Sequence, residues 1–426
     1  MKYYIETYGC QMNVSDSELI TTILDKAGHS EAEDLDQAEL IIFNTCSVRQ
    51  HAEDRVLGRI SCERARKTVN SRLKIAVVGC MAQRMGKSLI EKGIGVDLVV
   101  GVDQYLKLPD MIAELEDSAI VEQDSKQVYD DLVPKHHDPH CAFVTIMRGC
   151  DNFCSYCIVP HVRGRERSRD YREIEYEVEQ AISSGKYDIT LLGQNVNSYQ
   201  YEGVSFPMLL DRLSGLNKQY RLRFITSHPK DLSDELIEVM ARNPKISKHI
   251  HLPMQSGDSE ILERMNRKYD YSHYKALVDK LRRAMPEIAI TTDLIAGFPG
   301  ETESQFENTL KAISEIRFDY AFCFKYSNRE GTDAAEYDNQ VSEDIRLHRL
   351  QRMIDLQRQI TLEKFQDKIG TEIEVYVEAL SRKSNEQVSG KTDDYKIAVL
   401  SGDVALIGSF VKAQVIAATA GTLICE

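Results

Sequence analysis

The alternation of short apolar strands with amphipathic helices limits the folds open to this chain more than any other feature. In the first 130 residues each apolar run is followed by a helical pattern, and the runs lie at Lys2–Thr7, Leu40–Asn44, Lys74–Val78 and Asp97–Val100. This rhythm is typical of a parallel sheet with helices on both faces. We therefore predict an α/β fold whose N-terminal domain, residues 1–130, is a doubly wound parallel sheet.

A second series of strands and helices follows a predicted linker at residues 131–140, which is rich in charge, His and Pro. Its strands are expected at Ala142–Met147, Ile189–Gly193, Leu222–Thr226, Lys248–Leu252, Ile288–Leu294 and Ala321–Lys325. About six βα units close into a partial parallel barrel, which we place at residues 141–365. Short β-type runs after a long helical pattern predict a small all-β barrel at residues 366–426.

Three cysteines directly after the first of these strands form a C-x3-C-x2-C array, Cys150, Cys154 and Cys157. A structural zinc site normally takes four ligands, and a ferredoxin-type cluster also uses four cysteines. A compact trio therefore predicts a four-iron cluster with one iron open to another ligand. The alternatives are a zinc site completed by His161 and ordinary core thiols.

Three further cysteines, Cys10, Cys46 and Cys80, each fall within two residues of the end of a predicted strand. Parallel strands bring their carboxyl ends to one edge of the sheet, so these loops are expected to converge. Gly9 and Gly79 precede two of the thiols and would let the backbone approach a bulky ligand. A second three-cysteine site is predicted, with buried structural thiols as the alternative. The other four cysteines are assigned to packing, and they are Cys62, Cys141, Cys323 and Cys425.

Charge and length exclude several classes of protein. The formal net charge of -14 argues against nonspecific nucleic-acid binding, because affinity for phosphates comes from accumulated Lys and Arg. No stretch approaches the roughly 20 apolar residues of a membrane span, and the start is a polar strand pattern, unlike a signal peptide. Ten cysteines in 426 residues are too few for a disulfide scaffold. We expect a soluble cytoplasmic protein without membrane contact.

Polar residues after the strands of the second domain are candidates for binding a cofactor. Functional residues of parallel barrels sit in the loops that follow the strands. The predicted cofactor-lining residues are Tyr156, Gln194, Asn195, His251, Gln255, Ser256 and Asp293. The segment Gly297–Glu301 belongs to the same face, and it also reads as a turn into a helix capped by Thr302 and Gln305.

Two basic segments are candidates for contact with phosphates. Arg163, Arg165 and Arg167 stand in a run beside the cysteine trio, where guanidinium groups would lie near the chemistry. In the C-terminal barrel, a predicted loop at residues 381–392 mixes basic and amide side chains suited to phosphates and base edges, among them Arg382, Gln387 and Lys391. A solvated charged turn and a solvated hairpin are the respective alternatives.

Seven segments together carry a resemblance over nearly the whole chain. They are Tyr8–Asn13, Asn44–Arg49, Val78–Gln83, Arg148–Arg169, His251–Gly257, Met265–Arg267 and Gly297–Thr302. The chain resembles the methylthiotransferases, a family of radical S-adenosylmethionine enzymes. The resemblance implies an N-terminal cluster-binding domain, a central radical domain and a C-terminal TRAM-like tRNA-binding barrel.

The resemblance also implies cofactors and roles. Cys150, Cys154 and Cys157 would hold the [4Fe-4S] cluster that binds S-adenosylmethionine, and Cys10, Cys46 and Cys80 an auxiliary [4Fe-4S] cluster. Two S-adenosylmethionine molecules would be used per turnover, one to methylate a sulfur and one to make a radical. The product would be a methylthio group at C2 of N6-isopentenyladenosine next to the anticodon.

Rival substrates and rival classes remain open at this point. Threonylcarbamoyl-adenosine in tRNA or a ribosomal-protein aspartate are alternative substrates, although Ser47–Arg49 and Gly164–Arg169 resemble the isopentenyladenosine branch. A noncatalytic metal protein that binds RNA is a rival of another class, and iron and sulfide analysis would separate the two. The expected partners are the tRNA anticodon stem-loop, an electron donor of flavodoxin or ferredoxin type and sulfur-supply proteins, and we expect a monomer.

The C-terminal barrel departs from the usual balance of an RNA-binding module. From roughly Phe365 onward it contains more acidic than basic residues. Recognition there would depend on local contacts, so charge reversal at Arg382 and Lys391 is expected to weaken tRNA binding.

Overall fold

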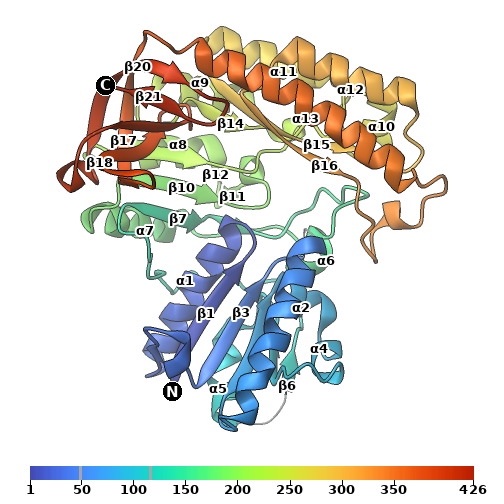
Figure 1. The fold of residues 1–426 in the computed structure, drawn as a ribbon, viewed down its shortest axis with the longest axis vertical. Coiled ribbons are helices and arrows are strands. Elements are labelled where there is room, and N and C mark those ends of the chain that lie inside the picture. The colour runs from blue at the N-terminus through green and yellow to red at the C-terminus, as the bar shows by residue number, and fades with distance from the viewer. Residues whose placement is uncertain (48–49, 115–117) are drawn as a thin grey trace.

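The structure, a computed structural model, describes residues 1–47, 50–114 and 118–426. Three bodies are visible in Figure 1: an N-terminal sheet domain in blue, a partial barrel above it, and a small β-barrel in red. Val48 and Arg49, two of the residues used above to distinguish the substrate branches, lie outside the described residues. No helix within the described ranges has the length and apolar character that crossing a membrane requires.

The N-terminal sheet is fully parallel, with strand order β2-β1-β3-β4-β5-β6. Its strands are β1 (Lys2–Tyr8), β2 (Ser30–Glu31), β3 (Leu40–Thr45), β4 (Lys74–Gly79), β5 (Leu98–Val100) and β6 (Ser118–Ile120). One face packs against α1 (Gln11–Lys26) and α5 (Leu108–Glu114), and the other against α2 (Gln50–Arg64), α3 (Cys80–Met85) and α4 (Ser88–Glu91). The predicted doubly wound sheet is confirmed.

Burial on both faces explains why β3 reads as a continuous apolar run. Leu40 and Ile42 pack towards α1, whereas Ile41 and Phe43 pack towards α2. Parallel strands that are covered on both sides have this composition. The strand order reverses between β1 and β3, and ligands of open α/β sheets bind beyond the carboxyl ends of the strands at such a switch point.

The central domain is the predicted partial barrel. Two three-stranded parallel sheets, β13-β10-β7 and β14-β15-β16, are joined by an isolated bridge between Leu222 and Ile246. The strands are β7 (Cys141–Thr145), β10 (Asp188–Leu192), β13 (Arg221–Phe224), β14 (His249–His251), β15 (Ala289–Ala296) and β16 (Tyr320–Lys325).

Amphipathic helices cover the outside of this barrel and bury one apolar stripe each against the strands. They are α7 (Tyr171–Ser183), α8 (Phe206–Ser214), α9 (Asp234–Arg242), α11 (Tyr271–Ala284), α12 (Glu303–Ile316) and α13 (Glu343–Gln366). Shorter elements lie in the connections, and they are β8 (Met147–Arg148), α6 (Val159–Arg163), β9 (Arg167–Ser168), β11 (Gln200–Tyr201), β12 (Val204–Ser205) and α10 (Ser259–Arg264).

The C-terminal domain is a closed barrel with strand order β17-β18-β19-β21-β20. Its strands are β17 (Glu372–Ser381), β18 (Ser384–Thr392), β19 (Ile397–Ser401), β20 (Phe410–Ala418) and β21 (Leu423–Cys425). The predicted loop at residues 381–392 is wrong, because β18 occupies most of it and pairs with β17 and β19. Closure of the barrel supplies backbone partners on both sides and overrides the weak strand preference of its Ser, Asn and Gly residues.

The C-terminal barrel is attached to the amino-terminal ends of the central strands, away from the loops that follow those strands. Arg223, near the start of β13, donates through Nη2 to the carbonyl of Thr392 at 2.8 Å. The ring of Tyr395 stacks on His249 with centroids 4.9 Å apart. Lys396 Nζ lies 3.0 Å from Asp319 Oδ1 just before β16. The turn between β18 and β19 therefore packs against the amino-terminal ends of the central strands.

Residues 131–140 run along α1 and bond to it. The backbone N–H of Lys135 donates to Thr22 Oγ1 at 2.8 Å, and His136 Nδ1 lies 3.0 Å from Glu18 Oε2. His136 Nε2 also lies 3.5 Å from Glu177 on α7. The connection between the two domains is thus packed into their interface.

Candidate functional site

The loop that carries Cys150, Cys154 and Cys157 is held by the segment after α10. Asn266 Nδ2 donates to the carbonyl of Phe153 at 2.8 Å, and the N–H of Ser155 donates to the carbonyl of Met265 at 3.1 Å. Phe153 has a φ of 45°, a left-handed conformation that this bond stabilises. The segment Met265–Arg267, which the resemblance singled out, therefore shapes the cysteine loop.

Two of the three thiols accept hydrogen bonds from neighbouring side chains. Asn152 Nδ2 donates to Cys150 Sγ, and Arg267 Nη1 donates to Cys154 Sγ, both at 3.3 Å. Burial and the neighbouring Cys154 raise the pKa of Cys157 to about 12. Such a thiol stays protonated at neutral pH unless a metal replaces its proton.

The surroundings of this trio do not favour a single metal ion. His161, the fourth zinc ligand considered above, is exposed on α6. Among residues 1–47, 50–114 and 118–426, no group of three metal-binding side chains with ligand atoms within 4.8 Å of one another includes any of these cysteines.

The second trio gathers at the carboxyl edge of the N-terminal sheet. Cys10 caps α1 after β1, Cys46 follows β3, and Cys80 begins α3 after β4. The last residues of these adjacent strands are in register, Tyr8 beside Thr45 and Thr45 beside Gly79. A hydrogen bond with Cys46 lowers the pKa of Cys10 to about 6. Burial raises the pKa of Cys80, and the negative charge of Cys10 raises it further.

The glycines before two of these cysteines make room for neighbouring loops, and their close approach to a ligand stays a prediction. A Cβ on Gly9, whose φ is 146°, would lie 2.7 Å from Cys46 Cβ. A Cβ on Gly79, whose φ is 88°, would lie 2.6 Å from the carbonyl of Thr45. A side chain at either position would push the cysteine loops apart.

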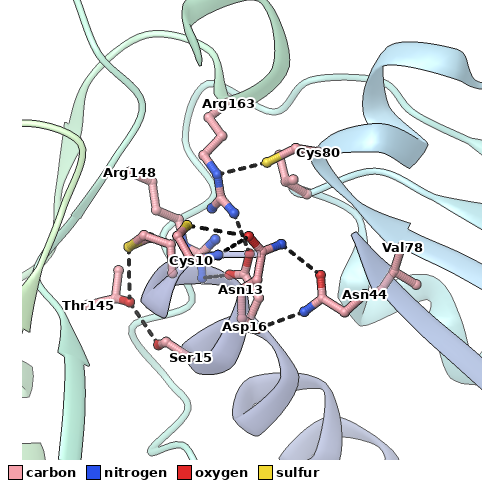
Figure 2. Close-up of polar contacts among 12 residues, drawn as sticks. Cys10, Asn13, Ser15, Asp16, Asn44, Val78, Cys80, Thr145, Arg148 and Arg163 are labelled. Carbon is pink, nitrogen blue, oxygen red and sulfur yellow. Dashed lines mark hydrogen bonds and ion pairs between the residues drawn. The ribbon is translucent and has the colours of Figure 1, made fainter. Parts of the chain in front are cut away.

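Two asparagines connect the loops of the second trio, Asn44 and also Asn13, to which sequence reasoning assigned no role (Figure 2). Asn13 Nδ2 donates to Asn44 Oδ1 at 3.0 Å, and Asn44 Nδ2 donates back to the carbonyl of Asn13 at 2.7 Å. Both side chains are fully buried. A buried amide pair must be satisfied internally, so it holds α1 and the end of β3 in one arrangement.

A buried ion-pair network links the two trios. Asp16 on α1 lies 2.9 Å from Arg148 Nη2 and 2.7 Å from Arg163 Nη2, and Arg163 Nε donates to Cys80 Sγ at 3.2 Å (Figure 2). Burial alone would raise the pKa of Asp16, but the two guanidinium groups hold it below its ordinary value. Arg148 and Arg163 flank the other cysteine loop, so one carboxylate of the N-terminal domain fixes both ends of that loop.

The basic run after the first trio is not the solvated loop considered above. Arg163, Arg167 and Arg169 are all at least nine-tenths buried. Arg167 bonds Asp103 through Nη2 at 3.0 Å, and Arg169 bonds Glu177 at 2.8 Å. Arg163 and Arg167 are neutralised across the domain interface by Asp16 and Asp103, whereas Arg169 pairs with Glu177 of its own domain. Of the three arginines predicted to contact substrate, Arg165 alone is exposed, with its guanidinium 4.5 Å from the ring centre of Phe153.

The predicted cofactor-lining residues divide into three groups. Asn195 donates to Ser198 and Asp231 and accepts from the N–H of His228, and the hydroxyl of Ser256 lies 3.3 Å from Thr309 on α12. These two side chains are occupied by protein groups. His251 Nε2 lies 3.4 Å from Asp293, and both remain partly exposed. The other three are Tyr156, which accepts from Arg267 at 3.3 Å, Gln255, which is buried with a φ of 71°, and Gln194.

The predicted contacts of the C-terminal barrel lie in different surroundings. Arg382 is exposed in the turn between β17 and β18, and Gln387 is half-buried on β18. Lys391 Nζ pairs with Glu378 at 2.7 Å. The carbonyl of Lys391 also accepts from Arg221 at 2.9 Å, so this lysine belongs to the interface with the central domain.

One further group of possible metal ligands lies at this interface. Ligand atoms of Cys141, Asp188 and Glu378 come within 4.8 Å of one another. Asp188 is already paired with Arg223 at 2.8 Å, and Glu378 with Lys391 at 2.7 Å. Positive groups at that distance oppose a cation, so the cluster is an ion-pair network that joins two domains.

Three family profiles match the chain, one for each body. The Radical SAM superfamily matches residues 144–313, the Uncharacterized protein family UPF0004 matches residues 2–101, and the TRAM domain matches residues 366–426.

Similar proteins are found along the full length. A tRNA-2-methylthio-N(6)-dimethylallyladenosine synthase of Bacteroides thetaiotaomicron is 45% identical over 99% of this chain and 95% of its own length. One with the same name from a Thermoanaerobacter species is 44% identical over 99% of this chain and 91% of its own. Among solved structures, the radical S-adenosylmethionine methyltransferase TsrM of Kitasatospora setae matches with a TM-score of 0.60 and 15% identity, over 76% of this chain and 72% of its own. That likeness shows a shared fold.

Proposed function

Because this chain belongs to the methylthiotransferase family of radical S-adenosylmethionine enzymes, together with the tRNA-2-methylthio-N(6)-dimethylallyladenosine synthases, we propose that its two cysteine trios form the reaction centre. The enzyme adds a methylthio group to C2 of N6-isopentenyladenosine in tRNA and uses S-adenosylmethionine and two [4Fe-4S] clusters. The observation that carries the proposal is the buried Asp16 that pairs with both Arg148 and Arg163 between the trios.

The donor atoms of the chain fit these cofactors. Each trio offers three sulfur ligands, which leaves one iron of a four-iron cluster for a small molecule. Among the described residues, two buried polar atoms without a protein partner are Arg163 Nη1, on the guanidinium that bonds Cys80, and Gln194 Oε1, in the loop after β10. A buried polar atom of this kind calls for a partner that the protein does not supply.

The bound cofactors supply a 5′-deoxyadenosyl radical, which the reaction needs because the C2–H bond of adenine is too inert for acid-base removal. The chain itself binds and orients. Arg267 and Asn152 hold the thiols of the first trio by hydrogen bonds at 3.3 Å. Asp16 pairs with Arg148 and Arg163 and so joins the N-terminal domain, which carries the second trio, to the loop that carries the first. We assign S-adenosylmethionine contacts to Gln194, Gln255, His251 and Asp293.

The chemistry also indicates which part of tRNA and which other proteins would act with this enzyme. An adenine in an anticodon loop is unpaired, which lowers the cost of bringing it to a buried site. We therefore propose the anticodon stem-loop as the part of tRNA that enters the site. A flavodoxin or ferredoxin would supply electrons, sulfur-supply proteins would renew the sulfur, and the cytoplasm, where tRNA is modified, is the proposed location.

The substrate is tested by nucleoside mass spectrometry. Anaerobically reconstituted protein is incubated with S-adenosylmethionine, a reductant and tRNA that carries either N6-isopentenyladenosine or threonylcarbamoyl-adenosine. We expect the methylthio product on the isopentenyl nucleoside alone. Conversion of the threonylcarbamoyl nucleoside, with the isopentenyl nucleoside left unchanged, would contradict the assigned substrate.

A charge reversal tests the role of the C-terminal barrel. Because Arg382 is exposed in a turn, Arg382→Glu is expected to weaken tRNA binding. It should also make the fall of log K with log salt shallower, by about one unit of slope. The control is Lys92→Glu, which makes the same change at an exposed lysine of the N-terminal domain. Binding curves at several salt concentrations are the measurement, and equal affinity of Arg382→Glu and wild type would remove this contact. Lys391 is unsuitable for this test, because reversing its charge would break the ion pair with Glu378.

A further inference from the structure

A buried arginine of the central domain donates a hydrogen bond to a cysteine of the N-terminal domain. Arg163 is the last residue of α6, and its side chain is only 4% exposed. Nε donates to Cys80 Sγ at 3.2 Å, and Nη2 contacts Asp16 at 2.7 Å (Figure 2). Nη1 is buried and has no hydrogen-bond partner among the described residues. The guanidinium thus uses one nitrogen on Cys80 and one on Asp16, and its third nitrogen, Nη1, has no protein partner among the described residues.

The first trio has a comparable donor of its own. Arg267 Nη1 donates to Cys154 Sγ at 3.3 Å, and Arg267 lies in the same domain as that thiol. Arg163 differs because it reaches across the domain interface, directly after the loop of the other trio. Docking of the two domains therefore completes the surroundings of the second site.

Charge and hydrogen bonding at cluster sulfurs set the reduction potential of an iron-sulfur cluster. A buried cation beside a thiolate ligand stabilises the reduced, more negative state, because the interior screens charge weakly. A carboxylate next to that cation opposes part of the effect. Arg163 and Asp16 should therefore move the potential in opposite directions.

We propose that Arg163 is a positioning residue of the auxiliary site, which holds Cys80 in place and raises the reduction potential of the auxiliary cluster, while Asp16 limits that rise. The inference rests on the proposed function, since it takes Cys10, Cys46 and Cys80 as cluster ligands.

The test uses the full chain with Cys150, Cys154 and Cys157 replaced by alanine, so that a single cluster remains. After anaerobic reconstitution, its potential is measured by a redox titration followed by electron paramagnetic resonance. We expect Arg163→Gln to shift the potential to a more negative value, Arg163→Lys to restore part of the shift, and Asp16→Asn to shift it to a more positive value. The control is Arg242→Gln, which removes an exposed guanidinium of α9 and should leave the potential unchanged.

Each outcome decides a separate claim. An unchanged potential in Arg163→Gln and Asp16→Asn, at equal iron and sulfide content, would overturn the inference and leave Arg163 as a structural contact only. Should Arg163→Gln fail to hold iron, Asp16→Asn decides alone, with a more positive potential in support and an unchanged one against. A parent chain that binds no iron would instead contradict the proposed function.

Discussion

Joint replacement of Cys10, Cys46 and Cys80 by alanine is expected to abolish methylthio transfer to tRNA while S-adenosylmethionine is still cleaved. The three thiols converge at one edge of the N-terminal sheet, whereas Cys150, Cys154 and Cys157 lie in a loop of the central domain with its own supporting bonds. The radical site should therefore survive without the other. Iron should fall from about eight to about four atoms per chain.

The measurement pairs chromatography of 5′-deoxyadenosine with mass spectrometry of the tRNA nucleosides. Cys62→Ala is the control: the packing role predicted for Cys62 is wrong, because this thiol is exposed near the C-terminal end of α2. It should keep full iron and full activity. Formation of the methylthio nucleoside by the triple variant would show that the N-terminal cysteines are dispensable.

The second large effect is expected on stability, from Asp188→Ala. Asp188 and Arg223 are paired at 2.8 Å with side chains 2% and 1% exposed. Removal of one partner leaves a buried charge uncompensated, which costs about 3–5 kcal/mol. Arg223 also donates to the carbonyl of Thr392 at 2.8 Å, so the same change should loosen the C-terminal barrel.

Urea unfolding of the metal-free chain under reducing conditions measures this loss. The matched control is Glu175→Ala, which removes a carboxylate from a partly exposed pair with Arg212. Such pairs contribute about 0–1 kcal/mol. A midpoint for Asp188→Ala that equals that of Glu175→Ala would show that the buried pair contributes little to stability.

The convergence of Cys10, Cys46 and Cys80 could be predicted because it depends on one rule of parallel sheets. Adjacent parallel strands end at the same edge, so thiols directly after β1, β3 and β4 had to meet whatever their distance in sequence. The six strands of the central barrel were predictable for a similar reason, since each apolar run alternates with an amphipathic helix.

The burial of Arg163 could not be predicted, because the carboxylate that neutralises it lies far away in sequence. Charged runs usually lie in solvent, and only the docking of α1 against the cysteine loop brings Asp16 to this guanidinium. The close packing around Gly9 and Gly79 could not be predicted for the same reason, since Cys46 and Thr45 approach them from another loop. Tertiary contacts also decide that Asn195 bonds Asp231 and is not free for a ligand.

Strand β18 was not predicted because its residues have neither a high strand propensity nor a clear apolar pattern. Serine, asparagine and glycine are poor strand formers, and only Val388 supplies a fully buried apolar side chain. A Cβ on Gly390 would lie 1.9 Å from the carbonyl of Tyr376, which shows how closely β17 and β18 approach. The barrel thus forms this strand through pairing with its neighbours.

Mössbauer spectroscopy of the anaerobically reconstituted, iron-57-labelled full chain tests the central claim most directly. Two cubane clusters per chain are predicted, and S-adenosylmethionine should perturb one iron site of the cluster held by Cys150, Cys154 and Cys157. Alanine variants of either trio should each retain one cluster. A wild-type spectrum with a single cubane, or a second cluster that persists without Cys10, Cys46 and Cys80, would contradict the account.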